Sequence, residues 1–131
     1  NIFEKKPISI YNNGNMSRDF TFISDIVEAT YLCSLKIPYI EKNNKKPSSS
    51  NLHKIFNVGN GKPVNLLKFV ELIEDALSLK AIKIFEEIQP GDVEKTYAET
   101  NLLKKWINFE PKVDINEGVK KFVNWFLDFY S

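Results

Sequence analysis

The sequence is poor in the residue types from which metal sites, disulfides and membrane spans are built. Its 131 residues include one cysteine, Cys33, and one histidine, His53, which excludes an internal disulfide and argues against a dedicated transition-metal site. It has no apolar run of about 18 residues, as a membrane-spanning helix requires, and its first residues lack the apolar core of a signal peptide. A formal net charge of +1 gives no reason to expect nucleic acid as a partner. We therefore expect a cytoplasmic protein with neither nucleic acid nor a membrane as partner.

Signatures of catalysis are missing as well. A dinucleotide-binding turn needs closely spaced glycines directly after a strand, and the five glycines of the chain, at 14, 59, 61, 91 and 118, lack that spacing. No tyrosine is followed four positions later by a lysine, the spacing that would suggest a dehydrogenase base. His53 has no acidic or nucleophilic neighbour in a structured motif, and Cys33 falls on the apolar side of a predicted helix, where an inert buried thiol is expected. We assign no catalytic, cofactor-binding or metal-ligating residue.

The apolar residues, 43% of the chain, follow the periods of a single small α/β domain. Alternation predicts a few short strands of mixed direction, at residues 7–12, 20–23, 54–59 and 81–88. Helical spacing predicts three to four amphipathic helices, which start near residues 25, 66, 101 and 115, and the aromatic residues of the last two are expected in the core. The expected N-caps are polar residues at each helix start: Ser24 or Asp25, Asn65, Thr100 or Asn101, and Asp114.

Residues 41 to 54 are polar and rich in lysine, asparagine and serine. This composition predicts a mobile, solvated loop. Its lysines have no interleaved aromatic rings, so they do not indicate a binding patch. We place no site there.

One basic residue differs from all the others. Of the 18 basic side chains, 17 are lysine and only Arg18 is arginine. An arginine offers a planar fork that binds phosphate or carboxylate through two hydrogen bonds, whereas a lysine offers a mobile point charge. Arg18 is therefore a candidate clamp for such a group, with an ordinary surface ion pair as the alternative.

Three segments at predicted strand ends look like parts of one ligand site. Residues 11–20 hold Tyr11, a tight turn and Arg18, so that a ring can stack on a planar base while the guanidinium holds a phosphate. Residues 56–61 end in a glycine turn. Residues 89–93 present Asp92, a carboxylate suited to the two hydroxyls of a ribose or sugar.

In this order the segments resemble the C-terminal part of the extended short-chain dehydrogenase/reductase family, and most closely its UDP-glucuronate 4-epimerases. Residues 7–36 are similar to that family's Pro-Ile-x-x-Tyr-x-x-Gly-x-x-x-Arg-Asp-Phe-Thr segment and the helix after it. Residues 55–73 resemble its Ile-Tyr-Asn-x-Gly segment, and residues 89–98 its Gln-Pro-Gly-Asp-Val-x-x-Thr-Tyr-Ala segment. The resemblance covers nearly the whole chain apart from residues 37–54.

The resemblance implies that residues 1–131 are a small α/β nucleotide-sugar-binding domain that lacks a Rossmann domain. The longer enzyme would be an NAD-dependent sugar 4-epimerase of capsular polysaccharide biosynthesis, and a homodimer is one expectation for it. The missing Rossmann domain would hold NAD and the Tyr/Lys base pair. This part alone would then be inactive and bind no cofactor.

Site residues follow from the same resemblance, position by position. Tyr11 and Ser9 would lie at the uracil of a UDP-sugar, Arg18 at its diphosphate and Asp92 at its ribose. Gln89 stands where many relatives have an arginine beside the second phosphate. Five further residues are interpreted as structural, with Asp25 as a helix cap and Phe20 in the core: Asp19, Phe20, Asp25, Asn57 and Gly59.

Two alternatives remain open. The chain could be part of a dehydratase or reductase of the same superfamily, because the residues that distinguish these enzymes are not in this sequence. It could also be a standalone, non-catalytic binding domain, which a natural start codon near Asn1 would favour.

We expect the chain to bind NAD too weakly to measure, because no glycine turn brings backbone amides to a pyrophosphate. Calorimetric titration of the chain with NAD tests this. Binding in the micromolar range would contradict the assignment of NAD to a preceding domain.

Overall fold

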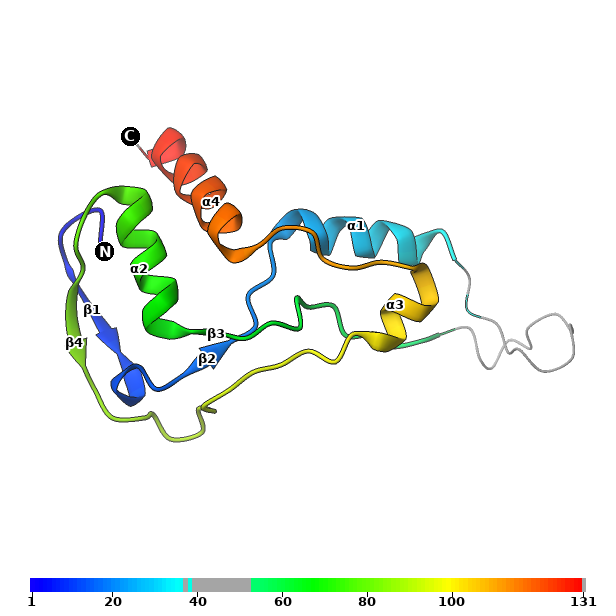
Figure 1. Cartoon of the computed structure of the whole chain (residues 1–131), viewed down its shortest axis with the longest axis horizontal. Helices are drawn as coiled ribbons and strands as arrows, with labels where there is room; N and C mark the ends of the chain where they lie inside the picture. The colour runs from blue at the N-terminus through cyan, green and yellow to red at the C-terminus, as the bar shows by residue number, and fades with distance from the viewer. Residues whose placement is uncertain (37, 39–52, 131) are drawn as a thin grey trace, which may run out of the picture.

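Two small apolar cores lie at opposite ends of the fold (Figure 1). The computed structural model describes residues 1–36, 38 and 53–130. The predicted α/β class, with a few short strands of mixed direction and three to four helices, is confirmed in these residues, which form four helices. The elements in chain order are β1 (Pro7–Ile10), the 3-10 turn η1 (Tyr11–Gly14), β2 (Ser17–Arg18), α1 (Ile23–Ser34), β3 (Val64–Asn65), α2 (Leu66–Leu77), β4 (Ile82–Phe85), α3 (Asn101–Ile107) and α4 (Ile115–Tyr130).

The first core lies between α2 and a parallel pair of strands. β1 pairs with β4 from Pro7 opposite Ile82 to Ile10 opposite Phe85. The side chain of Asn65 caps α2 as predicted, because its Oδ1 accepts hydrogen bonds from the backbone of the first turn at 2.9 and 3.3 Å. The apolar face of α2 then packs on residues from the N-terminal stretch and β1, and the cluster consists of Ile2, Ile8, Ile10, Leu66, Leu67, Val70, Ile73, Leu77, Leu79 and Ala81.

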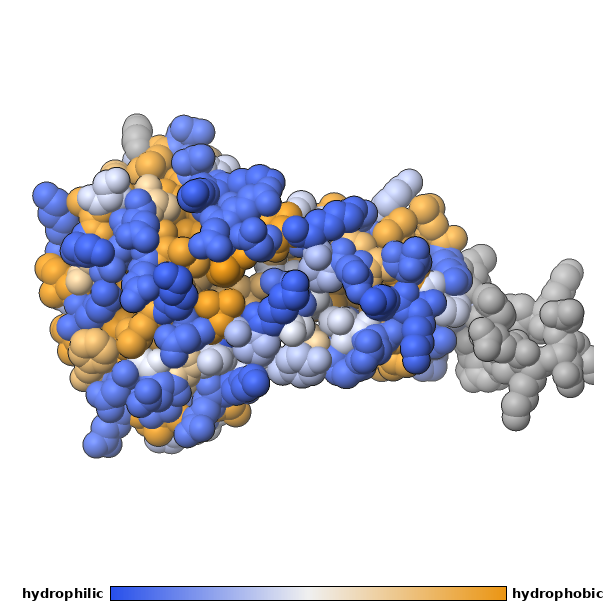
Figure 2. All heavy atoms as spheres, viewed as in Figure 1, coloured by the Kyte–Doolittle hydropathy of each residue, from blue (hydrophilic) through white to orange (hydrophobic). Residues whose placement is uncertain are grey.

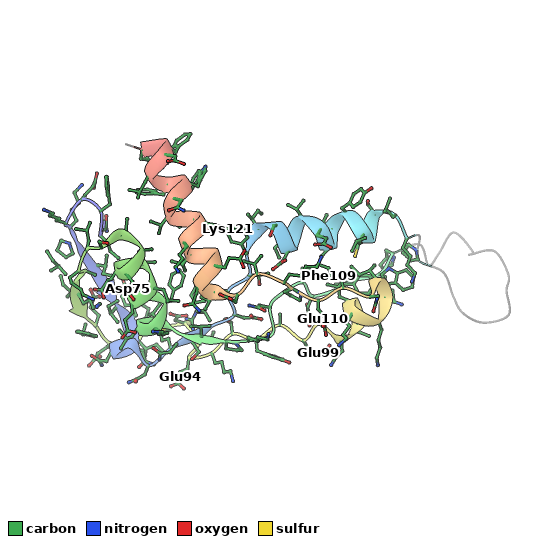
Figure 3. All side chains as sticks on the ribbon, turned by 45° about the horizontal axis from the view of Figure 1, so that its top comes forward. Asp75, Glu94, Glu99, Phe109, Glu110 and Lys121 are labelled. Carbon is green, nitrogen blue, oxygen red and sulfur yellow. The ribbon has the colours of Figure 1, made fainter. Side chains whose placement is uncertain are left out.

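The second core lies at the other end, under α1 and α3. Ala29 of α1, Leu103 of α3 and Phe109 are buried there, and Figure 3 labels Phe109. Cys33 is half-buried beside them, and burial raises the pKa of its thiol. An unreactive thiol, as expected from the sequence, fits this environment.

A narrow region of extended chain joins the two cores (Figure 1). β2 pairs antiparallel with β3, where Arg18 lies opposite Val64. On its other side, β2 bridges in parallel from Ser17 to Lys95. Phe20 is half-buried and stacks on Phe69 of α2, with ring centroids 4.0 Å apart, so it packs between elements as its predicted structural role requires.

Two of the four predicted strands are wrong. Residues 20–22 are irregular and Ile23 already begins α1, and residues 54–59 form no strand in the described part of the chain. Both segments have the composition of strands. A strand also needs a hydrogen-bonded neighbour, and apolar alternation does not reveal whether one is present.

The predicted helix cap at Asp25 is also wrong. α1 begins after Phe22 without a side-chain cap. Asp25 instead lies within the first turn and is buried, where its Oδ2 accepts a hydrogen bond from the Val113 N–H at 3.1 Å. The carboxylate therefore joins α1 to the segment that leads into α4.

The predicted cap of α3 is wrong, whereas the predicted cap of α4 is confirmed. α3 follows Thr100 without a side-chain cap from that residue, and the carboxylate of Glu99 accepts the Asn101 N–H at 2.8 Å instead. Asp114 caps α4 as predicted, accepting the Glu117 N–H at 2.9 Å. The sequence analysis did not predict Glu99, which lies one position before Thr100, as a capping residue of α3.

The prediction that the last aromatic residues lie in the core is wrong for most of α4. Trp106 of α3 is buried, but four aromatic residues of α4 are at least half exposed: Phe122, Trp125, Phe129 and Tyr130. Their rings contact one another along the helix; for example, the ring centroids of Trp125 and Phe129 are 5.7 Å apart. Figure 2 shows apolar side chains at the surface over this end of the molecule. Helical period tells which residues share a face, but it does not tell whether that face is covered.

The predicted mobile loop of residues 41 to 54 falls, apart from His53 and Lys54, outside the described residues. Both of these residues are exposed. Within residues 1–36, 38 and 53–130, none of the helices combines the length and the apolar character needed to cross a bilayer.

A buried ion pair joins α2 to β4. The side chain of Glu74 is 2% exposed, and its carboxylate lies 2.7 Å from Nζ of Lys83 and accepts the Ala81 N–H at 2.8 Å. The hydrogen bond from Lys83, followed by that from Ala81, lowers the pKa of Glu74 from its ordinary 4.5 to about 2. A buried carboxylate is costly unless it is paired in this way.

Replacing Glu74 with glutamine should lower the free energy of unfolding at pH 7 by about 1–3 kcal/mol, because Lys83 loses its charged partner. Since the folded pKa lies below the ordinary one, this stabilisation is complete above pH 4.5 and disappears as the pH falls towards 2. Urea denaturation of both proteins across this pH range measures the difference.

Glu71→Gln is the matched control, because Glu71 is an exposed residue of the same helix paired with Lys68. It should change stability by less than about 0.5 kcal/mol. If the two substitutions lowered the free energy of unfolding equally, the burial of Glu74 would not add to the stability that its ion pair provides.

Candidate functional site

Two stretches of chain, far apart in sequence, run side by side and carry all five predicted site residues. Beyond β1 and β4 the backbone contacts continue, because the Glu86 N–H donates to the Ile10 carbonyl at 3.0 Å and the Ser17 N–H to the Glu94 carbonyl at 2.8 Å. We call residues 9–18 and 86–96 together the site edge. The first stretch holds Ser9, Tyr11 and Arg18, and the second holds Gln89 and Asp92.

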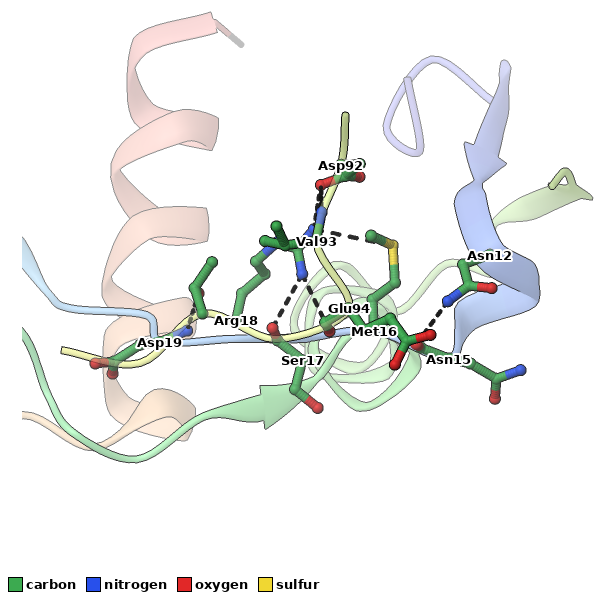
Figure 4. A network of polar contacts seen from close by, with 10 residues as sticks. Asn12, Asn15, Met16, Ser17, Arg18, Asp19, Asp92, Val93 and Glu94 are labelled. Atoms are coloured by element: carbon green, nitrogen blue, oxygen red, sulfur yellow. Dashed lines mark hydrogen bonds and ion pairs between the residues drawn. The ribbon is translucent and has the colours of Figure 1, made fainter. Parts of the chain in front are cut away.

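Arg18 and Asp92 are in direct contact (Figure 4). Nη2 of Arg18 lies 2.8 Å from Oδ1 of Asp92, and the two side chains are 25% and 32% exposed. Nη1 of Arg18 donates to the carbonyl oxygens of Ser17 at 3.0 Å and Glu94 at 3.3 Å. Several acceptors therefore fix the guanidinium in a partly buried position, as its fork geometry allows.

Asp92 ends a turn that begins at Gln89. The Asp92 N–H donates to the Gln89 carbonyl at 3.1 Å, and Gly91 between them has a φ of +86°, a conformation that favours glycine. Oδ1 of Asp92 also accepts the Val93 N–H at 2.8 Å. Gln89 thus acts here through its backbone, and the residue is exposed.

Ser9 and Tyr11 lie further along the same edge, where β1 ends. Oγ of Ser9 donates to Oε1 of Glu86 at 2.6 Å. Tyr11 is half-buried and begins the turn η1, whose residue Asn13 donates its N–H to the Glu86 carbonyl at 3.0 Å. The structure thus brings Arg18 and Asp92 together and places Ser9 and Tyr11 near Glu86.

The N-terminus of α2 lies beside Arg18, since β3 pairs with β2 and leads directly into this helix. Helix N-termini attract anions through free N–H groups. Here the Leu66 N–H donates to the Met16 carbonyl at 2.8 Å, and Asn65 takes the next two. Arg18, rather than the end of α2, is therefore the group suited to an anion.

Asp19 is the polar centre of the region between the two cores. Its Oδ2 accepts the N–H groups of Gly61 and Ala98, each at 3.0 Å, and its Oδ1 accepts that of Lys62 at 3.3 Å. Its own N–H donates to Oγ1 of Thr96 at 3.0 Å. The sequence indicated a structural role for Asp19, and these contacts confirm it, but its partners were not foreseen because all the groups that it accepts from are backbone amides.

Gly59 is confirmed as structural by the space around it. A Cβ at this position would lie 2.3 Å from Cβ of Ala98 and 3.1 Å from Oδ2 of Asp19. Neither neighbour can yield without breaking the contact between them. Asn57 is structural too, because its Nδ2 donates to the Glu99 carbonyl at 3.3 Å.

A polar hollow of about 430 Å³ adjoins Asp19 and is lined also by Asn57, Thr96 and Tyr97. A second hollow, of about 240 Å³, is apolar and lies between α2, α4 and the start of α1. Its apolar lining does not suit a phosphate. Among the described residues, no group of three or more His, Cys, Asp or Glu side chains could hold a metal ion.

Known proteins match this chain over nearly all of its length, although no family model does. Protein CapI of Staphylococcus aureus is 40% identical, over 99% of this chain and 40% of that protein. A probable UDP-glucuronate 4-epimerase of Rhizobium meliloti is 39% identical, over 95% of this chain and 38% of that protein. The UDP-glucuronic acid 4-epimerase from Bacillus cereus, solved with UDP-glucuronic acid and NAD, has a TM-score of 0.77 at 22% identity, over 97% of this chain and 37% of that one.

In sequence the chain is similar to part of the curated UDP-glucuronate 4-epimerases. The resemblance inferred from the sequence motifs is thereby confirmed, and the solved structure confirms the fold. The chain spans 40% and 38% of the length of the two curated relatives named above.

Replacing Asp19 with asparagine should lower the free energy of unfolding by about 2–3 kcal/mol. One amide oxygen cannot accept all three backbone N–H groups, and the amide nitrogen would face donors. Urea denaturation measures the loss, and hydrogen exchange should localise it to the amides of Gly61 and Ala98.

Asp75→Asn is the control, on an exposed residue of α2 that Figure 3 labels, and it should stay within about 0.5 kcal/mol of the parent. If the Asp19 variant matched this control, the three backbone contacts would carry no weight in joining the cores.

Proposed function

We propose that this chain is the nucleotide-sugar-binding part of an NAD-dependent UDP-sugar 4-epimerase that acts on UDP-glucuronate. The observation that carries the proposal is the contact between Arg18 and Asp92 at the site edge. It joins a cation suited to a diphosphate and a carboxylate suited to ribose hydroxyls, on segments that match the epimerase motifs. The names of the curated relatives and the UDP-glucuronic acid in a solved neighbour support the substrate class.

Binding of the diphosphate would exchange partners at this contact. Arg18 offers parallel N–H groups that match two phosphate oxygens, and the doubly charged diphosphate is a stronger acceptor than the single carboxylate of Asp92. Asp92, once released, can accept hydrogen bonds from the two hydroxyls of the ribose. Asp92 would keep the hydrogen bond from the Val93 N–H, and the ribose hydroxyls would replace the guanidinium as donors to its carboxylate.

The remaining predicted residues would act along the same edge. The ring of Tyr11 offers an apolar face on which the uracil could stack. Oγ of Ser9, which donates to Glu86 in the free chain, can turn to the uracil instead. Gln89 begins the turn that presents Asp92, and its uncharged amide leaves Arg18 as the cation that binds phosphate there.

The part that this chain plays in catalysis is positional. Holding the nucleotide at a distance from the reacting carbon supplies binding energy that orients the sugar. When bound, NAD takes up and returns the hydride of an epimerisation. The residues of this chain do not fit NAD, because its glycines lack the spacing of a dinucleotide turn and the N-terminus of α2 is capped from within. We therefore assign NAD to the part of the relatives that this chain does not span.

Two finer assignments belong to the same proposal. The name of protein CapI supports a role in capsular polysaccharide synthesis, and the absence of a chemical signature for the sugar leaves a dehydratase or reductase as the second candidate. A solved UDP-glucose 4-epimerase from Thermotoga maritima has the same fold, with a TM-score of 0.78 at 23% identity. Fold alone therefore does not choose the sugar.

Arg18→Lys should weaken binding of UDP to this chain by roughly tenfold, although the charge is retained, because the second hydrogen bond of the fork is lost. Titration of the isotopically labelled chain with UDP, followed by NMR, gives the dissociation constants. Asp92→Asn should also weaken UDP binding but leave the binding of inorganic pyrophosphate equal or tighter, since the competing carboxylate is gone.

Lys121→Gln is the control, because this lysine lies on α4 in an exposed pair with Glu117. It should leave UDP binding unchanged. An Arg18→Lys protein with the parental dissociation constant would remove Arg18 from the site and leave the proposal without its main support.

A further inference from the structure

The last helix, α4, carries a row of aromatic rings that the rest of the chain leaves uncovered (Figure 2). Phe122, Trp125 and Phe129 are 52%, 53% and 68% exposed, and their spacings of three and four residues place them on one side of the helix. The ring centroids of Phe122 and Trp125, like those of Trp125 and Phe129, are 5.7 Å apart. We call these three residues the aromatic seam. Apolar residues at alternating spacings of three and four are the pattern through which helices pair in coiled coils.

The other side of α4 already packs within the chain. Val119 and Val123 are buried, and the ring of Phe126 meets the ring of Phe3 edge to face, with centroids 5.7 Å apart. These contacts hold the helix in place with the aromatic seam at the surface. Large exposed apolar patches are uncommon on monomeric proteins, and they often mark surfaces that bind another protein.

Two opposite charges border the aromatic seam on the same flank. Lys121, which Figure 3 labels, and Asp128 are both exposed. They lie seven residues apart, about two helical turns, so they occupy equivalent positions beside the seam. Lys121 also lies 2.6 Å from Glu117, one turn earlier, in an exposed ion pair. This flank of α4 is therefore basic beside Phe122 and acidic beside Phe129.

This arrangement of charges is complementary to itself when a second helix runs in the opposite direction. In an antiparallel pair, equivalent flanking positions of the two helices face each other, so Lys121 of each copy lies beside Asp128 of the other. A parallel pair would instead bring Lys121 beside Phe126 of the second copy, where it finds no charge. Charges that border an apolar contact fix its register and direction in this way.

We propose that α4 is an interface between two copies of this chain, which pair through their aromatic seams with the helices antiparallel. Such an interface is two-fold symmetric, so each contact occurs twice. Trp125 lies near its centre, and one ion pair between Lys121 and Asp128 lies towards each end. The inference is independent of the proposed UDP binding, because α4 lies outside the site edge.

The apolar hollow of about 240 Å³ adjoins one end of the aromatic seam, since Gly118 and Phe122 line it. In the antiparallel pair, Phe129 of the second copy lies opposite Gly118. The ring of Phe22 covers this glycine, because a Cβ there would lie 3.2 Å from it. The incoming ring would thus meet Phe22 at the edge of an apolar hollow, which is a suitable environment for an aromatic side chain.

A lipid surface fits α4 less well than a second copy does. Helices that lie on membranes are rich in lysine or arginine on their polar face. On the flank of the aromatic seam, Lys121 is offset by Asp128 and by its partner Glu117, so the flank offers no excess of positive charge to anionic lipid.

Sedimentation equilibrium of the chain over a range of protein concentrations tests the pairing. We expect an equilibrium between monomer and dimer, and Trp125→Asp should weaken it by roughly tenfold or more, because a carboxylate would be buried without a partner. Tyr31→Asp is the matched control, on an aromatic residue of α1 that is 61% exposed, and it should leave the dissociation constant unchanged. A parent chain that stays monomeric at every concentration would overturn the proposal, as would a control variant as weak as Trp125→Asp.

Exchanging the flanking charges tests the antiparallel direction. Lys121→Asp and Asp128→Lys should each weaken self-association by roughly tenfold, because like charges then face each other at both ends. An equimolar mixture of these two variants should form a heterodimer as tight as the parental dimer, since every acid again meets a base. Recovery in the mixture would also show that both variants fold.

Lys120→Asp is the control for the charge exchange, because Lys120 is exposed on another side of α4, and it should leave self-association unchanged. If the mixture of variants remained monomeric, or if Lys120→Asp acted as strongly as Lys121→Asp, the proposed interface would be wrong. Sedimentation of the chain with vesicles that contain anionic lipid should show no binding. Vesicle binding that Trp125→Asp abolishes would assign the aromatic seam to a membrane and contradict the proposal.

Discussion

The carboxylate of Asp19 is the interaction on which the arrangement of this chain depends. It accepts backbone N–H groups from Gly61, Lys62 and Ala98, on two segments that are far apart in the sequence. Gly59 permits the approach, because any side chain there would collide with Ala98. Since Arg18 directly precedes Asp19, the contacts that fix Asp19 also bring the guanidinium to the turn that presents Asp92.

The fold is built around a polar region rather than one large core. The two apolar clusters lie at opposite ends of the fold, and the chain between them is held by hydrogen bonds and short bridges. The proposed site extends from the end of β1, beside the first core, to the contact between Arg18 and Asp92.

Two helices, α1 and α4, expose apolar side chains at the surface. Large contiguous apolar patches are uncommon on the surface of monomeric proteins. This chain exposes four apolar residues of α1 and four aromatic residues of α4: Ile23, Val27, Tyr31, Leu35, Phe122, Trp125, Phe129 and Tyr130. The two curated relatives named above are longer than this chain, which spans 40% and 38% of them. The segment 55–58 has the apolar alternation of a strand but forms no ladder with any described part of the chain.

Local features were determined by the sequence itself. The cap at Asn65, the helices α2 and α4, and the strands β1 and β4 follow from residue types and spacings that act within a few positions. The motifs around Arg18 and Asp92 led to the resemblance to UDP-glucuronate 4-epimerases, because a motif is a local pattern too. The sequence analysis placed these two residues in one site, but it did not predict the direct contact between them.

Tertiary structure alone decided the rest. The failed strand at residues 54–59, the buried role of Asp25 and the exposed aromatic residues of α4 all depend on what lies across from each segment. Periodicity reports which side chains share a face, but only a partner segment supplies the hydrogen bonds and the cover. For the same reason the backbone amides that bind Asp19 were invisible in the sequence, since every residue except proline carries one.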